Sequence, residues 1–224
     1  KDYKKCPQEY IYKLKEIHSS ESTVRVYSSA FEQFCNYYKD IPLESITQEQ
    51  ITNYMRHLVI DRKVSSSYHN QAINAIKFYY ERVLNGERKI YLHDRPKKEQ
   101  KLPVVLNQEE VKSLLKCIDN IKHKAIVMLA YSSGLRLSEL VALKIKDIDS
   151  VQMQIRVEQG KGKKDRMTIL SERVLDTLRN YFKQYKPKEW LFEGADGGQY
   201  STRSVQQIVK DAAKKSGIKK KISV

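Results

Sequence analysis

Apolar residues recur at three- and four-residue steps through the first 90 positions, and this spacing most constrains how the chain can fold. Such spacing places the side chains on one face of a helix. Between about residues 22 and 39 the stripe consists of Val24, Tyr27, Phe31, Phe34 and Tyr38. Ser20 or Ser22 can cap the start of this helix, and Pro42 follows its end.

Three more helices are expected in the same part of the chain. One covers residues 9–17, and one begins at Thr47, where Gln50 completes the pattern of a capping box. A fourth opens at residues 65–67, carries an apolar stripe to Val83 and ends before Gly86. With no strand pattern present, residues 1–93 are predicted to form a small four-helix bundle.

Residues 94–103 are charged, contain two prolines and lack apolar periodicity, so we expect a linker at residues 94–105. The alternative is a long surface loop inside one domain. The linker interpretation leaves residues 106–224 as a second domain.

The second domain has a mixed pattern. Helices are expected at residues 107–118, 121–133, 138–143, 171–185 and 202–216, with Asn107 and Ser138 as N-caps and Gly134 as a terminator. Residues 152–158 and 166–170 flank a glycine- and lysine-rich turn, which predicts a β-hairpin. The predicted fold is therefore mainly α with a small antiparallel β-hairpin in the second domain.

The net charge of +15 favours a polyanionic partner. Because lysine and arginine are spread along the chain, they indicate folded domains that bind DNA rather than a disordered basic tail. The alternatives are a generic basic surface and a patch that binds a membrane surface.

Several classes of protein are disfavoured. The three cysteines are widely spaced and indicate reduced thiols in a cytoplasmic protein. The five histidines lack metal-ligand spacing, so no metal is expected. No apolar run approaches the ~20 residues that a membrane span requires. No glycine-rich segment matches a phosphate-binding loop, so nucleotide binding is disfavoured.

Two short segments carry the candidate chemistry. Arg136 follows the helix-ending Gly134 and could present its guanidinium to a phosphate, with Glu139 orienting it. The alternative is an ordinary Arg–Glu pair three residues apart. Lys161 lies between two glycines in the hairpin turn and could act as a general acid. The alternative is a solvated basic turn.

Together these segments resemble the tyrosine recombinases, also called phage-integrase-type recombinases. The resemblance rests on SGLRLSEL at residues 133–140, LKIKDID at 143–149 and GKGKKDR at 160–166. KLPVVLNQEEV at residues 101–111 is similar to the start of the family's catalytic domain, most like the integron-type integrases. The helical first domain is similar to the family's core-site-binding domain.

The resemblance implies a role for three residues. Arg136 would clamp the scissile phosphate, Lys161 would protonate the departing 5′-oxygen, and Glu139 would support the arginine. Family members cleave duplex DNA with a tyrosine, form a 3′-phosphotyrosine link and recombine inverted-repeat core sites as tetramers, without metal or cofactor. Two basic domains would close around the duplex as a clamp.

The family's second box, His-x-x-Arg followed by the tyrosine nucleophile, is absent from these 224 residues. Tyr200 is the last tyrosine, and we assign it to packing or to the start of a helix. We therefore expect a truncated bacterial or archaeal recombinase that binds DNA but does not cleave it. The alternatives are a non-catalytic accessory relative and a basic module for RNA or an acidic protein.

DNA contacts are assigned by analogy with the family, in which helices two and four of the first domain face the major groove. The candidates there are Thr23, Arg25, Ser67, Asn70, Gln71, Asn74 and Lys77. Phosphate contacts are expected from Lys97 and Lys98 in the linker and from Lys163, Lys164 and Arg166 in the hairpin.

Overall fold

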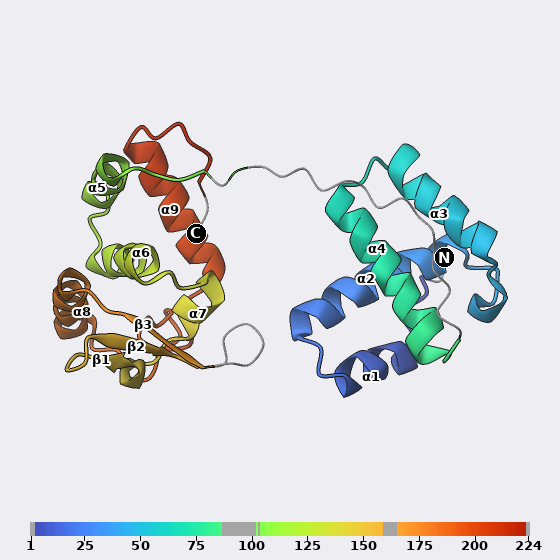
Figure 1. Ribbon diagram of the computed structural model, residues 1–224, viewed down its shortest axis with the longest axis horizontal. Helices are drawn as coiled ribbons and strands as arrows, with labels where there is room; N and C mark the ends of the chain where they lie inside the picture. The colour runs from blue at the N-terminus through green and yellow to red at the C-terminus, as the bar shows by residue number, and fades with distance from the viewer. Residues whose placement is uncertain (1–2, 87–101, 103, 159–164, 223–224) are drawn as a thin grey trace. The chain divides into compact units, whose positions relative to one another are not determined.

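The computed structural model describes residues 3–86, 102, 104–158 and 165–222 (Figure 1). The chain divides into two compact units, Lys1–Lys101 and Leu102–Val224, which are described separately. Most of the predicted linker, residues 94–101 and 103, lies outside the described residues, as does the hairpin turn at residues 159–164.

The first unit is a helical bundle, as its periodicity predicts. Its helices are α1 (Gln8–Glu16), α2 (Glu21–Tyr37), α3 (Gln48–Ile60) and α4 (Ser66–Phe78), with a 3-10 turn at Leu43–Ser45. Ser20 caps α2, Ser65 caps α4, and Thr47 and Gln50 form the predicted capping box on α3. The core is rich in aromatic residues and includes Tyr10, Phe31, Phe34, Tyr54, Leu58 and Ile76.

The fourth helix departs from the prediction at its end. Tyr79–Val83 is π-helical rather than a regular continuation of α4. The hydroxyl of Tyr80 donates to the carbonyl of Leu43 at 2.8 Å, and that of Tyr79 donates to Glu44 Oε1 at 3.2 Å. Two consecutive tyrosines thus reach the same 3-10 turn. A tertiary contact of this kind is invisible to helical periodicity.

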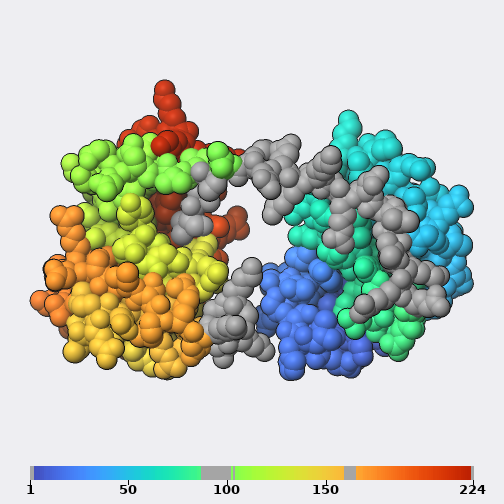
Figure 2. Space-filling model, viewed as in Figure 1, coloured from blue at the N-terminus to red at the C-terminus, as the bar shows by residue number. Residues whose placement is uncertain are grey.

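The second unit packs helices around a central helix and a small sheet. Its helices are α5 (Gln108–Lys116), α6 (Ile121–Ser133), α7 (Leu137–Ala142), α8 (Glu172–Tyr185) and α9 (Thr202–Lys215). Figure 1 shows α6 in the middle, with α9 on one side and α8 and the sheet on the other. The core residues of α6 are buried, and Figure 2 gives the same view as Figure 1 with the atoms drawn as spheres.

The sheet has three antiparallel strands in the order β1–β2–β3. The predicted hairpin is confirmed as β2 (Gln154–Val157) and β3 (Arg166–Ile169), with Val157 opposite Arg166. The first strand, β1 (Ile148–Asp149), was not predicted. Two residues are too few to show an alternating pattern, and the strand exists because it pairs with β2.

The turn between α6 and α7 requires a glycine. Gly134 ends α6 with φ 58° and ψ 33°, the left-handed region that favours glycine. The helix α7 then begins at Leu137 with Arg136 as its N-cap, so Ser138 is not the cap that the sequence predicted. The glycine therefore sets the direction in which the chain leaves α6 and reaches Arg136.

Replacing Gly134 with alanine is expected to destabilise the protein by about 1 kcal/mol. An added Cβ would meet nothing within 4 Å, so the cost comes from the backbone conformation alone. Urea unfolding measures the loss, and Gly134→Asn is the control because asparagine tolerates this region better. An alanine variant as stable as the wild type would contradict the assignment.

Candidate functional site

Glu139 is the centre of the candidate site. Its side chain is only 6% exposed and accepts three hydrogen bonds. The backbone N–H of Arg136 donates to Oε2 at 2.9 Å, Nη1 of Arg136 donates to Oε1 at 2.7 Å, and Nη2 of Arg166 donates to Oε2 at 2.8 Å. The carboxylate therefore binds the N-terminus of α7 and two guanidinium groups at once.

These hydrogen bonds keep the buried carboxyl group ionised. Burial tends to raise the pKa of Glu139, but the donors on Arg136 and Arg166 outweigh it, and the pKa lies below its ordinary value. One negative charge thus faces two positive charges. The cluster has a net positive charge, and the side chain of Arg136 is 55% exposed beside it.

The ion pair of Arg136 with Glu139 is present in the structure. The role of Arg136 as a phosphate ligand stays a prediction, with which the 55% exposure of its side chain is compatible. Arg166 binds Glu139 in the structure, and its predicted contact with a phosphate stays a prediction. No local signal could reveal the contact of Arg166 with Glu139, because 27 residues separate the two partners.

Two further hydrogen bonds tie β3 to the end of α6. Ser133 Oγ donates to the carbonyl of Ile169 at 2.9 Å, and Thr168 Oγ1 donates to the carbonyl of Ser133 at 2.7 Å. The strand that begins with Arg166 is thereby fixed against the turn that carries Arg136. Lys161, Lys163 and Lys164 lie outside the described residues.

The predicted DNA contacts of the first unit lie on α2 and α4, which pack against each other. Arg25 and Ser67 are exposed, whereas Thr23, Asn70, Gln71, Asn74 and Lys77 are half-buried. Some of these side chains already have partners. The Thr23 hydroxyl lies 2.9 Å from that of Ser20, and the Lys77 ammonium lies 3.5 Å from a carboxylate oxygen of Glu81. Lys97 and Lys98 lie outside the described residues.

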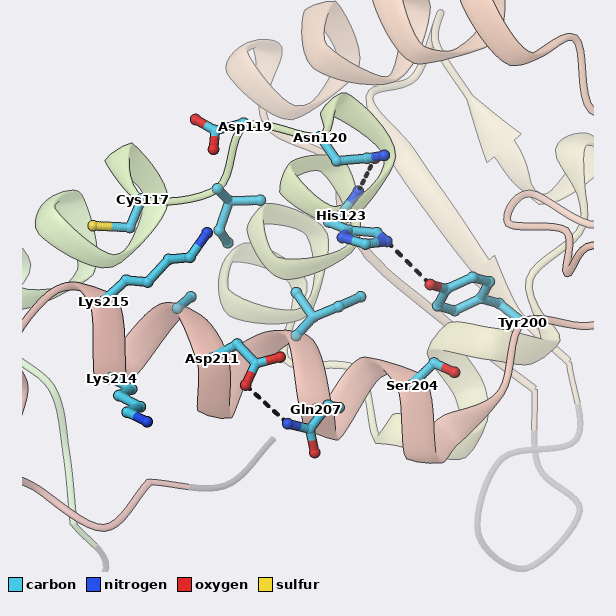
Figure 3. Close-up of a pocket in the computed structure, with 13 residues that line it drawn as sticks. Cys117, Asp119, Asn120, His123, Tyr200, Ser204, Gln207, Asp211, Lys214 and Lys215 are labelled. Carbon is cyan, nitrogen blue, oxygen red and sulfur yellow. Dashed lines mark hydrogen bonds between the residues drawn. The ribbon is translucent and has the colours of Figure 1, made fainter.

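A groove of about 870 Å³ lies between α9 and the loop that joins α5 to α6 (Figure 3). Tyr200 lines it, and its hydroxyl lies 3.1 Å from Nε2 of His123. The Lys122 ammonium lies 4.6 Å from the centre of the Tyr200 ring, and burial raises the pKa of the phenol. Tyr200 precedes α9, which begins at Thr202. Its contacts are those of a packing residue.

Neither a metal-binding cluster nor a membrane-spanning helix occurs among the residues that the structure describes. No three His, Cys, Asp or Glu side chains among them lie close enough together to hold a metal ion. Within the same part of the chain, every helix is too short or too polar to cross a membrane.

Both units match known protein families. Residues 104–224 match the phage integrase family, and residues 8–90 match the phage integrase N-terminal SAM-like domain. The chain therefore belongs to the phage integrase family of tyrosine recombinases.

Curated relatives support the assignment. The putative integrase/recombinase y4qK of Sinorhizobium fredii is 42% identical over 157 residues, which are 70% of this chain and 51% of the relative. Tyrosine recombinase XerD of Rickettsia bellii is 31% identical over 227 residues, which are 89% of this chain and 74% of the relative. The chain spans 51% and 62% of the length of the two Sinorhizobium fredii relatives that it matches.

Solved structures share the fold. The XerA recombinase is 28% identical with a TM-score of 0.51, over 96% of this chain and 78% of that one. A lambda integrase dimer bound to a COC′ core site is 17% identical with a TM-score of 0.71, over 96% of this chain and 83% of that one. The predicted fold, a helical first domain followed by a catalytic domain with a small sheet, is confirmed.

Proposed function

We propose that this chain binds duplex DNA and that the whole protein is a site-specific DNA recombinase of the cytoplasm. The observation that carries the proposal is the net-positive cluster of Arg136, Glu139 and Arg166 in a member of the tyrosine recombinase family. An exposed guanidinium held by a buried carboxylate is suited to binding a phosphate diester.

In the proposed reaction, a tyrosine hydroxyl gives up its proton to a neighbouring base or to water, and its oxygen attacks the scissile phosphorus and forms a 3′-phosphotyrosine bond. The bond to the 5′-oxygen breaks, and Lys161 supplies the proton that makes the leaving group a hydroxyl. Arg136 stabilises the charge on the phosphate oxygens, and Glu139 holds Arg136. The reaction conserves the energy of the phosphodiester bond.

We assign DNA binding without cleavage to these 224 residues by themselves, because they contain no His-x-x-Arg sequence. Reading the complete gene decides between a recombinase and a non-catalytic accessory relative. A His-x-x-Arg sequence followed by a tyrosine excludes the accessory role. Residues 101–111 span the boundary of the two units, and their resemblance to the integron-type integrases favours that branch of the family.

We assign the core-site contacts to the first domain, residues 1–93, and specifically to α2 and α4. Arg25 and Ser67 are the exposed candidates on these helices. Lys163 and Lys164 in the hairpin turn, and Lys97 and Lys98 in the linker at 94–105, would bind phosphates. Several relatives of known structure are bound to DNA core sites or to a Holliday junction. The proposed partners are therefore DNA with inverted half-sites and further copies of the whole protein.

Duplex DNA is expected to bind more tightly than single-stranded RNA of equal length. With six or more phosphate contacts, affinity should fall about a thousandfold between 50 and 200 mM salt. Fluorescence anisotropy with a labelled 30-base-pair duplex measures both effects. Selection from a random duplex library should then enrich inverted half-sites. Equal affinity for RNA would instead indicate a generic basic module.

A further inference from the structure

The carboxylate of Glu139 lies between the guanidinium groups of Arg136 and Arg166, and each of its oxygens accepts a hydrogen bond from a different one. Oε1 of Glu139 accepts a hydrogen bond from Arg136 at 2.7 Å, and Oε2 accepts one from Arg166 at 2.8 Å. Oε2 also accepts the backbone N–H of Arg136 at 2.9 Å. Because both oxygens are engaged, the carboxylate cannot rotate toward Arg136 without losing Arg166.

The charges of the three groups depend on Arg166. Arg136 and Glu139 alone would form a neutral pair, whose field at an approaching phosphate is weak. With Arg166 the cluster has a net charge of about +1, and Arg136 is its most exposed member. Arg166 thus offsets the negative charge of Glu139, and the positive charge of Arg136 remains available to an anion.

Strand geometry explains why Arg166 reaches Glu139. Successive side chains of a strand point to opposite faces, so Arg166 and Thr168 share one face of β3. Thr168 donates to the carbonyl of Ser133 at the end of α6, which confirms that this face lies against the turn that carries Arg136. Arg156 on β2 instead lies near Asp165, with 3.2 Å between Nη2 and Oδ2.

We propose that Arg166 is a positioning residue, which holds Glu139 so that Glu139 orients Arg136 and leaves it cationic. The inference rests on the proposed role of Arg136 as a phosphate ligand. It differs from the interpretation of Arg166 as a phosphate ligand in its own right. In that case the two arginines would contribute independently to DNA binding.

A double-mutant cycle on the 224-residue chain separates the two roles. Arg136→Gln, Arg166→Gln and the double variant are titrated with the labelled 30-base-pair duplex at several salt concentrations. Each single change is expected to weaken binding about tenfold. The double variant should bind no more than about twofold more weakly than Arg136→Gln. The log–log salt slope should fall by only ~0.9 in all three variants, since one phosphate contact is lost.

Additive losses, with a fall of ~1.8 in the slope of the double variant, would make Arg166 a phosphate ligand and overturn the inference. The inference would also be overturned if Arg166→Gln bound DNA as tightly as the wild type while Arg136→Gln bound it weakly. If Arg136→Gln itself binds as tightly as the wild type, the proposed phosphate clamp is wrong. The measurement below then decides the link from Arg166 to Glu139.

Carbon-13 NMR of the Glu139 carboxyl group reports this link directly. Loss of Arg166 is expected to raise the pKa of Glu139, because one of the donors that lower it disappears. Arg156→Gln removes an arginine from the neighbouring strand and should leave this pKa unchanged. An unchanged pKa in Arg166→Gln would overturn the inference.

Arg166→Lys covers the case in which Arg166→Gln does not fold. It keeps the positive charge beside Glu139 and should restore most of the DNA affinity. Circular dichroism establishes that each variant is folded. If Arg166→Lys still lowers affinity additively with Arg136→Gln, Arg166 binds phosphate itself and the inference fails.

Discussion

Arg136→Gln is expected to slow DNA strand cleavage by about a thousandfold in the protein expressed from its complete reading frame. The Arg136 side chain is 55% exposed and its guanidinium is held by a buried carboxylate, which suits it to stabilise charge on the scissile phosphate. Glutamine keeps a polar side chain but removes the charge and the two-pronged donor geometry. Single-turnover cleavage of the selected DNA site measures the effect.

DNA binding serves as the internal control for this variant. The substitution removes one phosphate contact of several, so affinity should fall no more than about tenfold. Arg179→Gln is the matched substitution, because Arg179 also pairs with an acidic residue three positions away, Asp176 at 3.7 Å. The Arg179→Gln variant should cleave DNA at the wild-type rate. Cleavage retained by Arg136→Gln would remove Arg136 from the catalytic mechanism.

Tyr10→Ala is expected to destabilise the first unit by about 4 kcal/mol. The Tyr10 side chain is fully buried, and its ring stacks on that of Phe31 with a centroid distance of 4.6 Å. Its hydroxyl donates to the carbonyl of Ala75 at 2.9 Å. The substitution removes both the ring and this link from α1 to α4. Such a loss is a large part of the total stability of a small domain.

Two variants of the same helix test the explanation. Tyr10→Phe keeps the ring and loses only the hydrogen bond, which should cost about 1 kcal/mol. Tyr12→Ala removes a tyrosine that is 59% exposed two residues along α1, and its effect should stay within about 0.5 kcal/mol. Urea unfolding followed by circular dichroism measures all three. Equal losses for Tyr10→Ala and Tyr12→Ala would contradict the assigned core.

The local signals in the sequence predicted most of the helices. Ser20, Thr47, Ser65 and Asn107 cap helices where their side chains indicate it, since capping depends on residues only three positions apart. The β2–β3 hairpin was predicted because its two strand patterns and its turn are also close together in the sequence. The π-helical stretch at Tyr79–Val83 was missed, and its tyrosines contact residues 35 or more positions away. The strand β1 was missed because two residues are too few to show a pattern. The start of α7 was misplaced because Arg136, rather than the better capping residue Ser138, is the N-cap.

The sequence by itself determined the family, the two-part helical architecture and the pairing of Arg136 with Glu139, which lie three residues apart in the chain. Only the tertiary structure decided that the carboxylate is buried and that Arg166 shares it. That contact depends on how β3 docks against α6, through the hydrogen bonds of Ser133 and Thr168. Docking is fixed by the packing of a whole core, and no local pattern of residues encodes it.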